Sequence, residues 1–196
     1  MTALAAARQL GAHRGTFAPR RTVWRKLNAR RLHLFTHGIV VSGAEGPKAA
    51  FRYDAMTMFR EAISVSVNGV RTSNSCTYTF LQPDGSKVKV DNNFAHFDQW
   101  GAEIQQGLVD AQFPAAQNTV AQGGHLRFDN LTIDRNGVTT PKGTASWFEI
   151  QRVDVDNGVL VLGKLGTRRD WYRQVVSKIP NFYVAYYLMR QLKRAG

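Results

Sequence analysis

The sequence has a single cysteine, Cys76, and no long apolar run. One cysteine cannot form a disulfide within the chain or a cysteine-only zinc site, so a reducing compartment is expected. The longest fully apolar run covers residues 182–189, far short of the roughly 20 residues that a membrane-spanning helix needs. No apolar segment follows the early basic residues, which argues against a secretory signal. We therefore expect a cytoplasmic protein, either soluble or peripheral to the inner face of the membrane.

Acidic residues are scarce at both ends of the chain. Residues 1–32 hold eight bases and no acid, and residues 164–196 hold eight bases with Asp170 as the one acid. The middle of the chain is mildly acidic, although the net charge of the whole chain is +12. With 196 residues, 43% of them hydrophobic and 20% charged, the composition is that of a folded chain of one medium or two small domains.

The basic start of the chain has three interpretations. A cleaved mitochondrial presequence would be rich in arginine and poor in acids, but such segments are usually rich in serine too, and the first serine here is Ser42. Contact with an anionic surface is the second, since each base near an anionic membrane contributes about 1 kcal/mol. The candidate residues for that contact are Arg20, Arg21, Arg25, Lys26, Arg30 and Arg31. The favoured interpretation is a solvated basic arm.

Alternating apolar and polar residues predict strands from Arg31 onward. Residues 63–67 and 76–80 alternate in this way, so we expect two neighbouring antiparallel strands, joined by a loop that extends to Ser75. The alternation places Cys76 on the inward face. This position favours a buried core thiol over a reactive nucleophile.

A change to steps of three and four predicts a helix over residues 93–112. Asn93 can cap this helix and Pro114 cannot continue it. Strands then resume, and a second helix is expected after Pro180, with Asn181 as its cap. Strands followed by a helix therefore occur twice.

The two halves also match in local sequence. LFTHGIVV at 34–41 aligns with LTIDRNGVTT at 131–140, which places Gly38 opposite Gly137 at a hairpin turn that calls for positive φ. Further along, Tyr53 aligns with Trp147. A strand meander closed by one helix, present in tandem, is the outline of two pleckstrin-homology-like (PH-like) units.

We therefore expect a mainly β (α+β) protein with two tandem PH-like β-sandwich or barrel domains, each closed by a C-terminal helix. The expected divisions are a basic N-terminal arm, a first domain, a linker and a second domain, at residues 1–29, 30–115, 116–123 and 124–196. Because two cores of this size are marginal alone, the domains are expected to pack together.

The chain resembles a family of bacterial proteins of unknown function, common in actinobacteria, that contain tandem PH-like domains. Besides the aligned segments above, the resemblance rests on FRYDAM at 51–56, PDGSKVKV at 83–90, FDQWGAEIQQGL at 97–108 and SWFEIQRV at 146–153. It covers residues 30–195. The resemblance implies a fold, and it brings no catalytic residue to this chain.

Two motifs come close to a phosphate or metal site. Residues 158–164 have the glycine spacing of a phosphate-binding loop, but Leu165 stands where a magnesium-holding Ser or Thr is needed and the interior is apolar, so we expect a strand. His33 and His37 share one face of a predicted strand, yet no third ligand lies near them in sequence. A structural role is favoured for both histidines.

Two further patterns point to catalysis or nucleic acid. Asp54 and Glu149 lie near the matched aromatic segments, but their offset repeat positions favour structural residues over an acid–base pair. The run RRDWYR at 168–173 interleaves bases with aromatic rings, although no recognised nucleic-acid motif accompanies it.

We expect a non-enzymatic binding or scaffold protein with no catalytic residue, metal or cofactor. The expected partner is a protein or an anionic membrane surface. The alternative function is a peripheral membrane protein that binds anionic lipid through its basic termini, and nucleic-acid binding is less favoured. The sequence indicates neither the partner's identity nor the oligomeric state.

Overall fold

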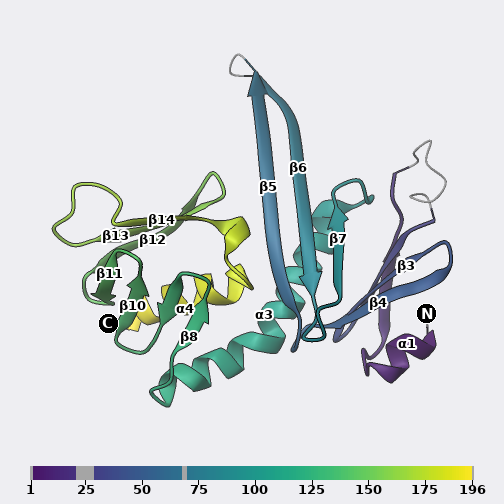
Figure 1. Ribbon diagram of the computed structural model, residues 1–196, viewed down its shortest axis with the longest axis horizontal. Helices are drawn as coiled ribbons and strands as arrows, with labels where there is room; N and C mark the ends of the chain where they lie inside the picture. The colour runs from purple at the N-terminus through teal and green to yellow at the C-terminus, as the bar shows by residue number, and fades with distance from the viewer. Residues whose placement is uncertain (1, 21–28, 68–69, 196) are drawn as a thin grey trace.

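The computed structural model describes residues 2–20, 29–67 and 70–195. It shows a mainly β protein with four small antiparallel sheets, arranged as two units along the long axis of the molecule (Figure 1). Within the described residues, no helix is long and apolar enough to cross a membrane.

The first unit combines a four-stranded sheet, a three-stranded sheet and a long helix. Its elements are α1 (Thr2–Ala7), β1 (His13–Phe17), β2 (Arg31–Phe35), β3 (Gly38–Gly43), β4 (Gly46–Arg52), β5 (Thr57–Val67), β6 (Val70–Leu81), β7 (Lys87–Asp91) and α3 (Phe97–Ala121). The sheets have the sequential orders β1-β2-β3-β4 and β5-β6-β7. Trp100, Ile104 and Leu108 of α3 are buried against these sheets, which confirms the predicted helical stripe. Cys76 is buried as predicted.

The β5–β6 hairpin is longer than expected. Its strands pair continuously from Thr57 opposite Leu81 to Val67 opposite Val70, with one register shift between Val65 and Ser66. The expected loop up to Ser75 is therefore wrong, because β6 already begins at Val70. The hairpin projects beyond the rest of the molecule (Figure 1).

The second unit repeats the order of the first: a sheet of four strands, a sheet of three and a helix. Its elements are β8 (Leu126–Phe128), β9 (Leu131–Ile133), β10 (Gly137–Thr140), β11 (Gly143–Ser146), β12 (Ile150–Asp156), β13 (Val159–Lys164), β14 (Tyr172–Val175), the 3-10 helix η1 (Val176–Lys178) and α4 (Phe182–Ala195). The sheets have the orders β11-β10-β9-β8 and β12-β13-β14. The segment resembling a phosphate-binding loop is strand β13 and the turn before it, as expected.

The internal repeat extends to backbone detail. Gly38 pairs with Arg52, the residue before Tyr53, and Gly137 pairs in the same way with the residue before Trp147. The predicted positive φ is wrong for both glycines. Glycine is needed for another reason, because a Cβ at either position would collide with a carbonyl oxygen of the neighbouring strand.

The N-terminal segment differs from the expected solvated arm wherever the structure describes it. Strand β1 pairs antiparallel with β2, with Thr16 opposite His33. Phe17 joins the main core, and Leu10 is fully buried in a small apolar cluster with Phe35. Residues 2–20 thus belong to the first unit, which begins before the expected boundary at residue 30. Residues 21–28 lie outside the described part of the chain.

Helix α3 replaces the expected linker. It begins four residues after the proposed cap Asn93 and continues through Pro114 to Ala121, so the predicted end and the linker at 116–123 are wrong. Proline inside a helix removes one backbone hydrogen bond. Burial of Ala116 and Val120 beyond Pro114 offsets that cost.

The two units share one apolar core that includes residues of both. α4 packs against the later turns of α3, where Gln117 Nε2 donates to Gln191 Oε1 at 2.6 Å. Asn181, expected to be a helix cap, has φ of 47° and directs its side chain to the first unit. Its Nδ2 donates to Gln112 Oε1 at 2.7 Å.

Candidate functional site

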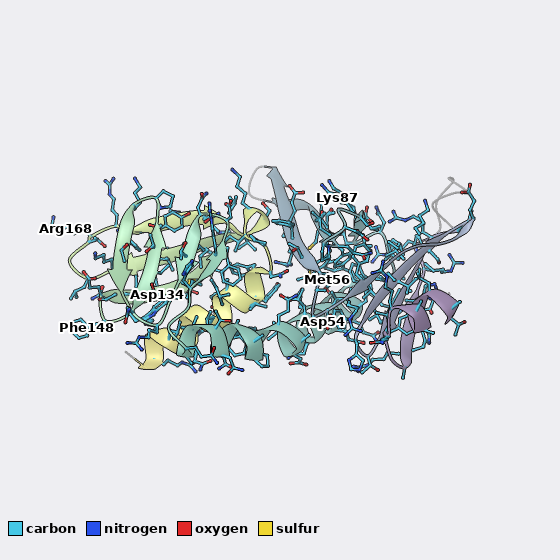
Figure 2. The ribbon with its side chains drawn as sticks, turned by 60° about the horizontal axis from the view of Figure 1, so that its bottom comes forward. Asp54, Met56, Lys87, Asp134, Phe148 and Arg168 are labelled. Atoms are coloured by element: carbon cyan, nitrogen blue, oxygen red, sulfur yellow. The ribbon has the colours of Figure 1, made fainter. Side chains whose placement is uncertain are left out.

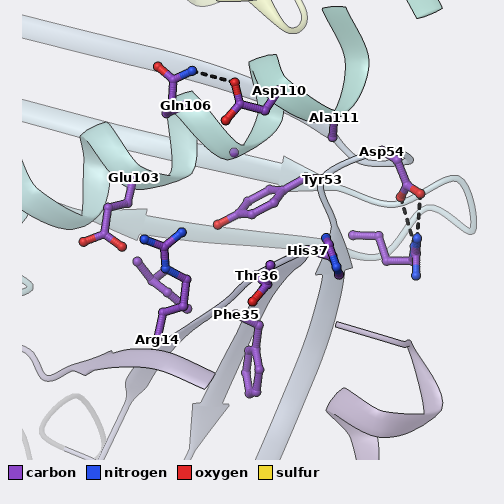
Figure 3. A pocket seen from close by; sticks show the side chains of 13 residues that line it. Arg14, Phe35, Thr36, His37, Tyr53, Asp54, Glu103, Gln106, Asp110 and Ala111 are labelled. Carbon is purple, nitrogen blue, oxygen red and sulfur yellow. Dashed lines mark hydrogen bonds and ion pairs between the residues drawn. The ribbon is translucent and has the colours of Figure 1, made fainter. Parts of the chain in front are cut away.

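A cavity of about 480 Å³ lies in the first unit, where β1, the β2–β3 turn and α3 meet (Figure 3). Its polar lining includes Arg14 from β1, His37 from the turn, and Glu103 and Asp110 from α3. The ring of Tyr53, which follows β4, lies between these elements. Segments about 90 residues apart in sequence therefore line one cavity.

Tyr53 is buried and held in place from two sides. Its backbone N–H donates to the carbonyl of His37 at 3.0 Å, and its ring packs directly on Gly107. A Cβ at Gly107 would lie 2.5 Å from Cε2 of that ring, so the helix approaches this closely only because the residue is glycine. Burial, followed by the charge of Glu103, raises the pKa of Tyr53 far above its ordinary value. The hydroxyl therefore stays protonated and remains able to donate a hydrogen bond.

Several charged groups around the cavity already have partners. Arg52 forms a two-point ion pair with Asp54, at 2.9 Å from Nε and 2.7 Å from Nη2, which lowers the pKa of the Asp54 carboxyl. Arg52 also donates to the carbonyls of Arg8 and Gln9 and so holds the N-terminal segment. These groups shape the cavity wall and have little capacity left for a ligand.

Among the described residues of the lining, Arg14, Glu103 and Asp110 are charged groups without an ion-pair partner, and Asp110 accepts one hydrogen bond from Gln106 at 2.7 Å. The guanidinium of Arg14 makes no hydrogen bond or ion pair with any residue that the structure describes, and Glu103 accepts a single 3.3 Å bond from Gln99. In Figure 3 the two side chains lie on the same side of the cavity, the side toward which the Tyr53 hydroxyl points. A cation and an anion thus line the same side of the cavity as a neutral hydroxyl.

The structure does not bring the suspected acid–base pair together. Asp54 is paired with Arg52 in the first unit. Glu149 belongs to the second unit, where it forms an ion pair with Lys164 at 3.1 Å and accepts from the N–H and hydroxyl of Ser146. Each carboxylate thus has its partners within its own unit.

The two histidines also have separate surroundings. His33 Nδ1 bonds Thr16 Oγ1 at 2.8 Å and its Nε2 bonds Ser42 Oγ at 3.1 Å, so its ring links β1, β2 and β3. His37 faces the cavity. Among the described residues, no group of three or more His, Cys, Asp or Glu is arranged to hold a metal ion.

The six bases proposed to contact an anionic surface are only partly described. Arg21, Arg25 and Lys26 lie outside the described residues. Arg20 is exposed. Arg30 donates to the carbonyl of Lys89 at 2.6 Å and lies over the ring of Phe94, and Arg31 donates to the carbonyl of Arg30.

Sequence reasoning missed the cavity because its residues come from separated segments. Gly107 was the one local signal, since a glycine in the middle of a helix often marks close packing. Nothing near Arg14 or Glu103 in sequence indicates that they line one cavity.

Fold and site define a mainly β protein of two repeated units, with a polar cavity in the first. The chain belongs to a family of unknown function, DUF6585, whose match covers residues 5–195 and so includes both units and β1. No curated protein and no solved structure matches the chain.

Proposed function

We propose that this chain is a non-enzymatic binding protein built from two PH-like units, and that the cavity of the first unit holds a free α-amino acid. The PH-like assignment is supported by the strand order, four then three then a helix, present twice. The observation that carries the binding proposal is that Arg14 and Glu103, which form no ion pair with each other, line the same side of the cavity as the Tyr53 hydroxyl.

The chemistry of an α-amino acid fits this arrangement. Such a ligand carries a carboxylate and an ammonium on one carbon, so its opposite charges are close together. The carboxylate accepts from Arg14 and the ammonium donates to Glu103, both as charge-assisted hydrogen bonds. The Tyr53 hydroxyl adds a neutral contact, and the ligand side chain lies toward His37 and Asp110. The volume is within the range of small-molecule sites.

Calorimetric titration with individual L-amino acids tests this function. N-acetyl amino-acid amides, which lack both charges, are the matched ligands that should not bind. Arg14→Gln and Glu103→Gln are expected to weaken binding by about tenfold or more each, since a hydrogen bond to a charged group contributes about 1.5–3 kcal/mol. Lys142→Gln and Glu45→Gln, exposed and outside the cavity, are the charge-matched controls.

Three results would contradict the proposal. The first is no binding of any amino acid at millimolar concentration. The second is equal binding of the uncharged amides. The third is chemical conversion of the ligand, which mass spectrometry of the recovered ligand would detect.

A further inference from the structure

Three loops meet at the end of the second unit that lies away from the first unit; together they are named the loop end. They are the β9–β10 turn at 134–136, the β11–β12 connection at 147–149 and the β13–β14 loop at 165–171. The N–H of Trp147 donates to the carbonyl of Asn136 at 3.1 Å, and the N–H of Leu165 donates to the carbonyl of Glu149 at 2.7 Å. These two bonds fix the loops to one another. Figure 2 shows Phe148 and Arg168 at this end.

The loop end exposes two large apolar side chains. Phe148 is 77% exposed and Leu165 is 52% exposed, the highest values among the large hydrophobic residues whose side chains the structure describes. Phe148 extends outward because its neighbours Trp147 and Ile150 are buried in the core. Because these two exposed apolar side chains lie on neighbouring loops, they offer apolar surface that a binding partner can bury.

Each acid of the loop end already has partners within the second unit. Glu149 is paired with Lys164 at 3.1 Å. Asp170 is paired with Arg152 and with Arg173, the latter at 2.7 Å. The remaining acid, Asp134, accepts from two backbone N–H groups of its own turn.

The arginines of the loop end have no such partners. Arg135, Arg168 and Arg169 are exposed, and their side chains make no hydrogen bond or ion pair within the part of the chain that the structure describes. Uncompensated positive charge therefore lies on two loops of the loop end, one of which carries Leu165, and both are bonded to the loop that carries Phe148. This combination matches a partner with an anionic face and an apolar layer directly beneath it.

We propose that the loop end docks on an anionic lipid bilayer, with Phe148 and Leu165 inserted below the headgroups and the three arginines bound to lipid phosphates and carboxylates. Large apolar residues enter the interface while arginines stay at headgroup level. The two apolar side chains protrude from separate loops, so a deformable surface accommodates them more readily than a rigid protein surface. The site is distinct from the basic residues near the N-terminus, which belong to the first unit.

Co-sedimentation of the full chain with vesicles tests the proposal. The vesicles contain equal parts phosphatidylserine and phosphatidylcholine, with pure phosphatidylcholine as the neutral comparison. Phe148→Ser with Leu165→Ser is expected to weaken binding by about tenfold or more. Arg168→Gln with Arg169→Gln is expected to weaken it by about twenty-five-fold, which corresponds to about fivefold for each base.

Matched controls separate the loop end from overall charge. Lys87→Gln with Lys89→Gln removes the same charge from the exposed face of β7, and Val155→Ser removes an exposed apolar side chain at the opposite end of β12. Both are expected to bind like the parent chain. Equal weakening by the lysine variant would show that net charge alone drives binding, which would overturn the proposal.

A separate fluorescence measurement tests whether the side chain at position 148 is inserted into the bilayer. In a Phe148→Trp variant, brominated phosphatidylcholine within the same anionic vesicles should quench the added fluorescence. Binding without quenching would overturn the insertion step. If the parent chain binds no anionic vesicles, the proposal fails and the loop end is better explained as a contact for an acidic protein surface. The cavity is untouched by all these variants, so amino-acid binding is unaffected by this outcome.

Discussion

Asn181 and Met58 exchange two hydrogen bonds between the two units. The N–H of Asn181 donates to the carbonyl of Met58 at 2.9 Å, and the N–H of Met58 donates to the side-chain oxygen of Asn181 at 2.7 Å. Met58 lies near the start of β5, an edge strand of its sheet. Asn181 therefore occupies the place that a neighbouring strand would take, and it links the second unit to the edge of the first.

Replacing Asn181 should destabilise the whole chain. Asn181→Ala leaves the Met58 N–H without its partner and places alanine at φ of 47°, so we expect a loss of about 2–4 kcal/mol. Asn181→Gly removes the same side-chain bonds but tolerates this backbone angle, so it should lose about 1 kcal/mol less. Urea unfolding of the intact chain measures both. A loss below about 0.5 kcal/mol in the alanine variant would show that the link contributes little.

Gly107→Ala should reverse the usual effect of alanine in a helix. Alanine ordinarily stabilises a helix interior by about 1 kcal/mol relative to glycine. Here its Cβ meets the ring of Tyr53, so we expect destabilisation and weaker ligand binding. In a Tyr53→Leu background the same substitution should stabilise the chain, a sign change that a double-mutant cycle detects. The same sign in both backgrounds would exclude this contact as the cause.

Gly38→Ala and Gly137→Ala should have similar costs. Each new Cβ would collide with a backbone carbonyl that cannot move aside as a flexible side chain can, so we expect a loss of about 2 kcal/mol or more from each. Gly163→Ala, whose Cβ would meet only the Arg152 side chain at 3.1 Å, is the milder comparison. Thermal unfolding of the three variants ranks them. A neutral effect at either repeat position would contradict their structural equivalence.

His33 should make stability depend on pH. Burial, followed by repulsion from His13, lowers the pKa of His33 in the folded chain. Below about pH 6.5 the unfolded chain therefore binds more protons than the folded chain, and stability falls as pH decreases. His33→Gln should flatten this dependence, whereas exposed His125→Gln should leave it unchanged. Urea midpoints between pH 5 and 8 provide the measurement, and identical pH profiles for the parent and His33→Gln would contradict it.

Local patterns predicted much of the fold. The strand that contains Cys76 and the aligned positions of Gly38 and Gly137 could be predicted, because the two-residue repeat of a strand is visible within a short segment of sequence. Pro114 misled the prediction because burial beyond it, at Val120, outweighs the missing hydrogen bond. Burial of this kind depends on residues that are distant in sequence, so a local sequence pattern does not indicate it.

The N-terminal strand and the cavity were harder to predict for a related reason. Strand β1 contributes Phe17 to the core but otherwise carries polar or small residues, so its alternation is weak. Arg14 and Glu103 line one cavity only because β1 and α3 pack in the same unit. The resemblance to a family of unknown function could not identify either residue.

Nuclear magnetic resonance of the labelled chain tests the central claim, that the first unit binds α-amino acids, most directly. A mixture of free L-amino acids is titrated in, and the Nε–Hε signal of Arg14 is followed with the backbone signals of residues 36–37, 53 and 103–107. We expect these signals to shift together and to saturate, and we expect no shift with the N-acetyl amides. Unchanged signals at Arg14 and around Tyr53, or shifts confined to the second unit, would contradict the proposed function.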